Sequence, residues 1–189
     1  MNVKSLATGL GAVCIVLLGV LSWAAPSWAY IQDDVDMLLE LKDCPVCVLN
    51  EANLSGQDFP QVNLKVAELT AANLSNTNLQ EANLMLAELK GADLGEANLE
   101  GATMNGARLQ GANLKGANLT GAVLTQANIE GANFQGANLE NAELTAAIIG
   151  NADWRGANLN GANLRGASWA DAVICDTVLP DGSVGDRNC

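Results

Sequence analysis

A large apolar residue recurs at every fifth position from Leu49 to Ile174, and the register holds across all 26 units. The residue two places earlier is Ala in 22 of these units, and a polar residue, most often Asn, lies between the two. The segment Ala112-Asn113-Leu114 is typical. A chain with this pattern must bury two side chains in every five along most of its length.

In an extended strand, residues two apart point to the same side, so the Ala and the large apolar residue of each unit both face inward. Because five is odd, a continuous strand would reverse this facing at every unit, and each unit must therefore contain a turn. Of the 25 residues from Glu51 to Asp171 that lie two places after the large apolar residue, 12 are Gly and three are Asn, which tolerate the positive φ of a type II turn. A helix is disfavoured because each Gly would cost it about 1 kcal/mol.

The repeated Ala-(Asn/Asp)-Leu-x-x pattern resembles that of pentapeptide-repeat proteins, and the resemblance covers residues 47–174. It implies an all-β fold, a right-handed quadrilateral β-helix (a solenoid) in which four pentapeptides make one coil. On that basis residues 20 apart stack on one another, and the 26 units form about 6.5 coils. We expect Phe134 to pack against Trp154 inside the C-terminal half.

Residues 1–29 are typical of a secretory signal peptide. Lys4 is the only charged residue before Asp33, an apolar run follows it, and Ser27-Trp28-Ala29 places small residues at the −3 and −1 positions of a cleavage site. We therefore expect export and cleavage after Ala29. An uncleaved membrane anchor is the alternative.

Residues 30–46 are interpreted as a short N-terminal capping helix and a linker. Asp33 can serve as the N-cap of a helix that reaches Lys42, and Leu38 and Leu39 share its apolar face. Because a solenoid exposes unpaired strand edges and core side chains at its ends, we expect this helix to cover the N-terminal opening.

Residues 175–189 are predicted to form a polar tail that cysteines close, with a turn at Pro180-Asp181-Gly182. The cysteines that follow the signal peptide are Cys44, Cys47, Cys175 and Cys189. The 128 residues between Cys47 and Cys175 correspond to about 31 Å along the rod at strand spacing, whereas a disulfide tolerates at most about 7 Å between Cα atoms. Within one chain this leaves the disulfides Cys44–Cys47 and Cys175–Cys189, and it excludes a metal site shared by the two pairs.

The segment Cys44-Pro45-Val46-Cys47 also has the C-x-x-C spacing of redox motifs. Such motifs belong to a βαβ context, whereas this one opens a β-helix. A staple at the first coil is therefore favoured over a thiol–disulfide switch.

The composition excludes several classes of function. The chain has no His, which removes the commonest general base and metal ligand. Nine basic against 21 acidic residues give a net charge of −12, so the basic footprint of a nucleic-acid binder is absent. We expect no catalytic residue, no cofactor and no metal. Glu68 and Glu88 would stack about 4.8 Å apart, which is near the separation of the two carboxyl groups in retaining glycosidases. They would lie on a convex outer face beside Arg108, with no cleft to exclude water, and this disfavours catalysis.

The resemblance to exported members of the family, which are typical of cyanobacteria, implies a non-catalytic rod for protein interaction or scaffolding in the thylakoid lumen or periplasm. The protein partner is unidentified, a homo-oligomer is a further option, and the membrane is met only through the cleaved signal peptide. The alternative is an acidic DNA mimic resembling the pentapeptide proteins that protect gyrase. Those act in the cytoplasm and pair through an apolar C-terminal segment, whereas this chain combines an export signal with a polar tail.

One corner of the expected coil differs from the others because it carries apolar residues where the others carry Gly or polar ones. The predicted interaction stripe consists of Val46, Val66, Met85, Leu86, Glu68 and Glu88. Monomeric proteins seldom leave large apolar patches bare, so an apolar stripe beside acidic residues indicates a recognition surface. The alternatives are that the N-terminal helix covers Val46 and Val66, or that these turn residues have no role.

Overall fold

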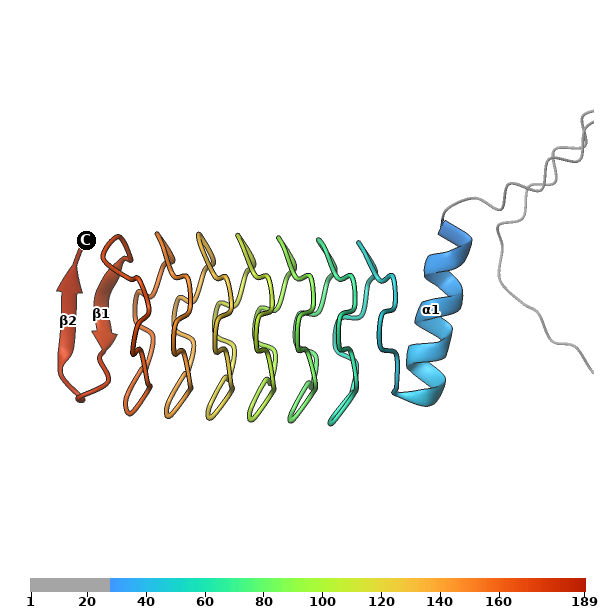
Figure 1. Cartoon of the computed structure of the whole chain (residues 1–189), viewed down its shortest axis with the longest axis horizontal. Helices are drawn as coiled ribbons and strands as arrows, with labels where there is room; N and C mark the ends of the chain where they lie inside the picture. Colours follow the sequence, from blue (N-terminus) through green and yellow to red (C-terminus); the bar gives the residue numbers. More distant parts are fainter. Residues whose placement is uncertain (1–27) are drawn as a thin grey trace, which may run out of the picture.

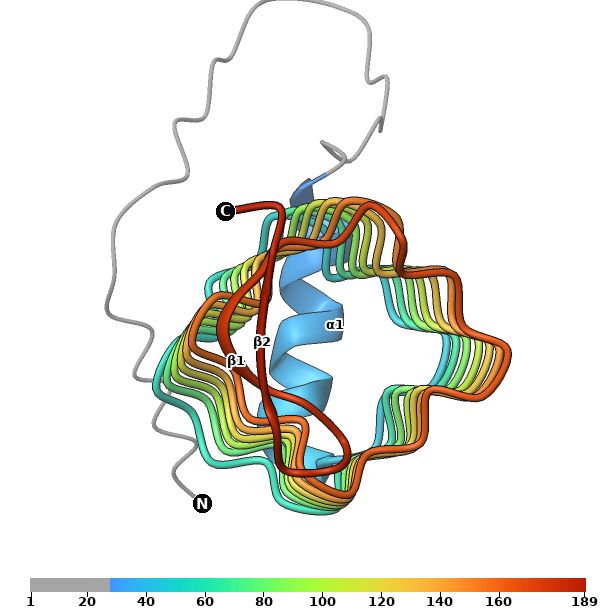
Figure 2. The same ribbon diagram turned by 90° about the vertical axis from the view of Figure 1, so that its left-hand side faces the viewer.

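The computed structural model describes residues 28–189, which form a rod of stacked coils. Helix α1 (Trp28–Leu41) lies at one end, and strands β1 (Ile174–Val178) and β2 (Val184–Arg187) lie at the other (Figure 1). Seen along the rod, the coils superpose in a four-sided outline (Figure 2). Residues 1–27, and with them most of the predicted signal peptide, lie outside the described residues.

Parallel bridges join residues 20 apart along the whole rod, from Asp43↔Asn63 to Asn158↔Val178. The N–H of Leu114 donates to the carbonyl oxygen of Asn133 in the next coil (2.7 Å), and the N–H of Asn113 donates to that of Ala92 in the preceding coil (2.9 Å). Each interior coil is therefore bonded to both of its neighbours. The expected stacking of residues 20 apart is confirmed.

The corners are tight turns of the expected type. The N–H of Ala117 donates to the carbonyl oxygen of Leu114 (3.1 Å), and Gly116 between them has a φ of 67°. A positive φ at the third position of such a turn is the type II geometry. Because every pentapeptide ends in a turn, the Ala and the large apolar residue of each unit face inward although the period is odd.

The core fills the inside of the coils. The Ala and Leu columns are buried along the rod, and the rings of Phe134 and Trp154 stack with centroids 4.3 Å apart, as predicted. Outside, the Asn residues of successive coils form ladders, in which Asn98 donates to Asn78 (3.2 Å) and Asn118 donates to Asn98 (3.1 Å). Apolar burial and polar ladders therefore both run along the rod.

Helix α1 begins at Trp28 and not at Asp33, so the prediction that Asp33 is the N-cap is wrong. No Pro or Gly lies between Trp28 and Leu41, and the helix extends through this whole segment. Leu38 is buried in the core cluster, and the carboxylate of Asp34 accepts a hydrogen bond from the N–H of Val48 (2.7 Å). The helix thus buries an apolar side chain against the first coil and satisfies a backbone donor at its edge.

The C-terminal tail forms an antiparallel hairpin in place of the predicted irregular tail. Strands β1 and β2 pair from Ile174↔Arg187 to Val178↔Val184. Thr177 is fully buried, and its hydroxyl donates to the carbonyl oxygen of Trp154 (2.7 Å). Among residues 28–189, no helix is both long enough and apolar enough to cross a bilayer.

Candidate functional site

The three apolar corner residues of the predicted stripe lie on successive coils of the rod. The N–H of Val46 donates to Lys65, that of Val66 to Met85 and that of Leu86 to Asn105, each to a carbonyl oxygen 2.9 Å away. Their exposed fractions are 67 % for Val46, 40 % for Val66 and 55 % for Leu86. Helix α1 lies at the end of the rod and leaves Val46 and Val66 exposed (Figure 1).

These residues line a surface groove of about 420 Å³. The corner groove is lined by Val46, Val66, Glu68, Leu86, Glu88, Gly106 and Arg108. Five of the six residues of the predicted stripe are therefore brought together. Met85 is not among the lining residues, whereas Gly106 and Arg108 line the groove and are not part of the predicted stripe.

Glycine at position 106 shapes the groove. A Cβ atom at this position would lie 2.7 Å from the Cδ2 atom of Leu86, so the exposed end of that side chain would have to move aside. Leu86 therefore lies across the corner of the next coil, where Gly106 leaves room for it. The repeat places Gly106 next to Leu86 on the same corner, because the two residues are 20 apart and therefore lie on successive coils.

The backbone at this corner is left-handed. The φ angles are 66° at Val46, 61° at Val66 and 59° at Leu86. Other corners with positive φ hold mostly Gly, Asn, Gln or Glu. A β-branched side chain at such a φ is uncommon and costs free energy. The fold does not require apolar residues at these three positions, since Gly106 occupies the same corner without strain.

The polar side of the groove comes from three stacked residues on the adjoining strand positions, joined as Glu68↔Glu88 and Glu88↔Arg108. Arg108 forms an ion pair with Glu88, with 2.9 Å between Nη1 and Oε2. The carboxylate of Glu68 accepts a hydrogen bond from the side-chain amide of Asn50 (3.0 Å). The groove therefore combines an apolar floor, one internal ion pair and one carboxylate whose contact is a neutral amide.

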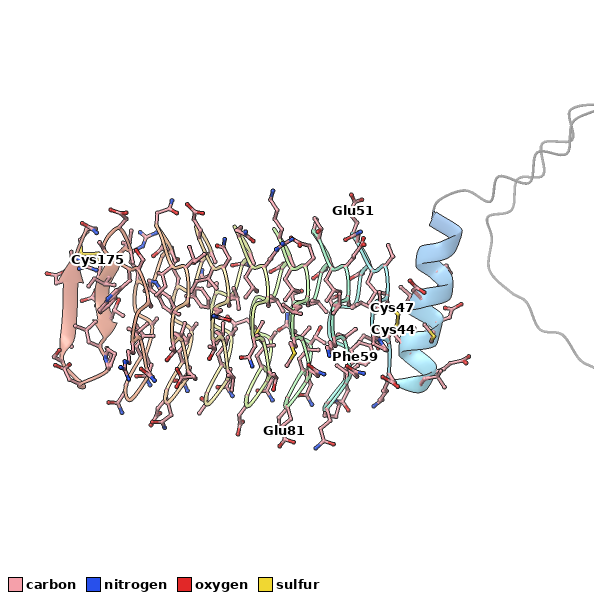
Figure 3. All side chains as sticks on the ribbon, in the orientation of Figure 1. Cys44, Cys47, Glu51, Phe59, Glu81 and Cys175 are labelled. Atoms are coloured by element: carbon pink, nitrogen blue, oxygen red, sulfur yellow. A yellow bond between two sulfur atoms is a disulfide. The ribbon has the colours of Figure 1, made fainter. Side chains whose placement is uncertain are left out.

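The cysteines of the described part of the chain lie at the two ends of the rod, with Cys44 and Cys47 next to α1 and Cys175 at the hairpin (Figure 3). The structure joins Cys44 to Cys47 and Cys175 to Cys189, with Cα atoms 5.5 Å and 5.6 Å apart. Both sulfurs of the first pair belong to buried residues, which favours the staple over the redox switch because exchange requires access to the sulfur. The ligand atoms of Cys175, Asp186 and Cys189 lie within 4.8 Å of one another, and in this disulfide form the two sulfurs are bonded to each other.

The family described as pentapeptide repeats matches residues 47–168 with eight copies. No curated protein matches the chain. Among solved structures, HetL, a pentapeptide repeat protein involved in heterocyst differentiation regulation in Nostoc sp. strain PCC 7120, is 29% identical, with 76% of this chain and 83% of that chain covered and a TM-score of 0.49. Rfr23 from Cyanothece 51142 is 31% identical, with 75% of this chain and 97% of that chain covered and a TM-score of 0.39.

A third solved structure is a pentapeptide repeat protein of the Arabidopsis thaliana thylakoid lumen. It is 29% identical, with 62% of this chain and 71% of that chain covered and a TM-score of 0.19. The repeat match extends over more than half of the sequence and coincides with the coils of the rod. The chain belongs to the pentapeptide-repeat family.

Proposed function

We propose that this protein is a non-catalytic, exported pentapeptide-repeat rod that binds a protein partner through the corner groove, in the thylakoid lumen or the periplasm. The observation that carries the proposal is the set of exposed apolar residues at left-handed corner positions, Val46, Val66 and Leu86. Backbone strain of this kind is concentrated at functional sites, where the strained residue contributes something other than stability.

Exposure strengthens the argument. When a strained residue lies in a core, the burial of its apolar side chain offsets the free-energy cost of the strain. These three residues are substantially exposed in the isolated chain, so burial does not offset that cost. A partner that covers them would remove apolar surface from water. Binding would therefore supply the stabilisation that folding of the single chain does not.

Two features support export. The segment up to Ala29 has the composition of a signal peptide, and cleavage there would leave Tyr30 as the first residue, inside α1. The cysteine pairs are placed for two local disulfides, and such bonds persist in oxidising compartments. We propose that both bonds form in the exported protein.

The proposal also covers the handedness of the rod, its number of coils and the roles of its two ends. We propose a right-handed path with about 6.5 coils over residues 47–174, on the count of four pentapeptides per coil. Residues 30–46 then act as an N-terminal cap, supported by the burial of Leu38 and the contact of Asp34 with Val48. Residues 175–189 close the other end.

Export is tested by fractionating cells that express the full chain and measuring the intact mass of the recovered protein. We expect a lumenal or periplasmic product that starts at Tyr30. A cytoplasmic product that retains Lys4 would contradict export and favour the acidic DNA mimic.

The interaction is tested by crosslinking in intact cells with the double variant Val66→Asn, Leu86→Asn. Asn tolerates positive φ, so the backbone is preserved while the apolar floor is lost. We expect specific crosslinked adducts to disappear. The matched control is the double variant Ala71→Asn, Ala146→Asn, which places Asn at two corner residues with a φ of 56° outside the groove. Retention of every adduct in the first variant would show that the groove is not the site.

A further inference from the structure

We infer that the occupant of the corner groove is a segment of a partner protein in which an exposed apolar side chain is adjacent to Lys or Arg. The inference rests on the proposed interaction function and adds the chemistry of the partner. It is carried by the shape of the groove and by the uneven pairing of the charges on its rim.

The apolar half of the groove sets the first requirement. The side chains of Val46, Val66 and Leu86 form its apolar lining, and Gly106 contributes no side chain beyond Leu86. The volume of about 420 Å³ lies within the range of about 300–1,000 Å³ in which proteins hold drug-sized ligands. A short peptide segment with one apolar side chain against Val66 and Leu86 matches this volume and lining.

The charged half sets the second requirement. Arg108 is paired with Glu88, and this is one of the two ion pairs among the side chains that the structure describes. Glu68 has no ion-pair partner among these described side chains, and its contact is the amide of Asn50. One negative charge is therefore left at the rim of the groove.

The field of the whole chain acts in the same direction. The net charge is −12, so a cationic segment is attracted and an acidic one is repelled before contact. An exposed ion pair adds little affinity, but complementary charge selects the partner and raises the association rate. Apolar contact with Leu86 and Val66 then supplies affinity, while Glu68 supplies selectivity.

A second copy of this chain is the competing occupant, because Leu41 and Lys42 form an exposed apolar–basic pair at the end of α1. Sedimentation of the exported chain separates the two. We expect a monomer at the concentrations used for binding. A dimer that the double variant Leu41→Ser, Lys42→Ser abolishes would overturn the inference in favour of self-association.

The direct test uses three blocked tetrapeptides, Gly-Leu-Arg-Gly, Gly-Leu-Glu-Gly and Gly-Ser-Arg-Gly, added to the exported chain with its disulfides intact. The readout is the NMR shift of the Val66 and Leu86 methyl groups. We expect saturable shifts with the Leu-Arg peptide, weakened by salt, and at least about tenfold weaker binding of the other two. Equal binding of the Leu-Glu peptide, or no saturable shift with any peptide, would overturn the inference.

A variant pair assigns the selectivity to one carboxylate. We expect Glu68→Gln to weaken the Leu-Arg peptide about threefold to tenfold and to remove most of its salt dependence. The matched control is Glu81→Gln. Glu81 also accepts an amide hydrogen bond from the preceding coil, from Gln61 (2.8 Å), but lies outside the groove. An equal effect of both substitutions would show that the charge preference comes from the net charge of the whole chain, and it would contradict the role of Glu68.

Failure of this inference is distinguishable from failure of the proposed function. One outcome is that the Val66→Asn, Leu86→Asn variant loses its cellular adducts while the peptides show no charge preference. That result would support the groove as the binding surface and reject the inferred chemistry of the partner. Selective peptide binding with unchanged cellular adducts would reject the proposed function at this groove.

Discussion

Single residues at the corners decide both the path of the backbone and the character of the surface. Gly116 and its equivalents adopt positive φ without cost, whereas Val46, Val66 and Leu86 adopt it against the preference of their side chains. The five-residue period predicted which residues occupy corners. It could not predict that Leu86 lies over Gly106 or that Arg108 pairs with Glu88, because the direction of a long side chain is not determined by the repeat.

Replacing Leu86 or Val66 by Asn is expected to leave the free energy of unfolding unchanged or to raise it by about 1 kcal/mol. Asn relieves the left-handed strain, and little buried apolar area is lost because both side chains are exposed. Chemical denaturation of each single variant measures this. A loss of more than about 2 kcal/mol would show that these side chains hold the corner together.

Asp153 is expected to titrate well below the ordinary range. Hydrogen bonding from Arg155, aided by Gln135, lowers the pKa of this carboxyl from 3.8 to about 2, although partial burial opposes the shift. Because the folded pKa lies below the unfolded one, this contribution to stability is fully present above about pH 4 and is lost as the pH falls towards 2. Carbon-13 NMR of the carboxyl group measures the midpoint. A midpoint near 4, or one that Arg155→Gln does not raise, would contradict the assignment.

At the scale of elements, the repeat predicted the coils and the turns but not the two ends. Helix α1 begins earlier than the sequence predicts, because the predicted boundary between the signal peptide and the capping helix with its linker falls inside it. The repeat does not predict the hairpin, because Thr177 and Leu179 keep the five-residue spacing of the two buried columns past Ile174 and so indicate one more unit. Thr77 marks the same pattern earlier in the rod, because its hydroxyl also bonds a carbonyl 23 residues before it.

The Cys175–Cys189 disulfide is expected to hold β2 against β1. The bond spans 14 residues, and closing a loop of this size stabilises by about 3 kcal/mol in the chain-entropy treatment. The double variant Cys175→Ser, Cys189→Ser should therefore lose about that much and exchange its β2 amide hydrogens faster, while Cys44→Ser, Cys47→Ser should leave β2 unaffected.

Peptide mapping without reduction and hydrogen exchange of the intact protein check this prediction. A disulfide between either N-terminal and either C-terminal cysteine within a monomer would contradict the rod, as the two pairs lie at opposite ends (Figure 3).

At the scale of the whole molecule, the rod separates stability from recognition. Stability comes from contacts between neighbouring coils, which are repeated along the axis, as in other solenoids. Corner side chains project from this frame, as Glu51 and Glu81 do on opposite sides of the rod (Figure 3). A corner can therefore exchange Gly for Val or Leu and acquire a binding surface while the coil beneath it is retained.

Position-specific photocrosslinking in intact cells tests the central claim most directly. A photoreactive residue is placed singly at Val66, Leu86, Ala71 or Ala146, all of which are exposed corner positions with positive φ. We predict a discrete protein adduct in the exported fraction from positions 66 and 86 and none from 71 and 146. Adducts of equal yield from all four positions, or from none, would contradict recognition through the corner groove.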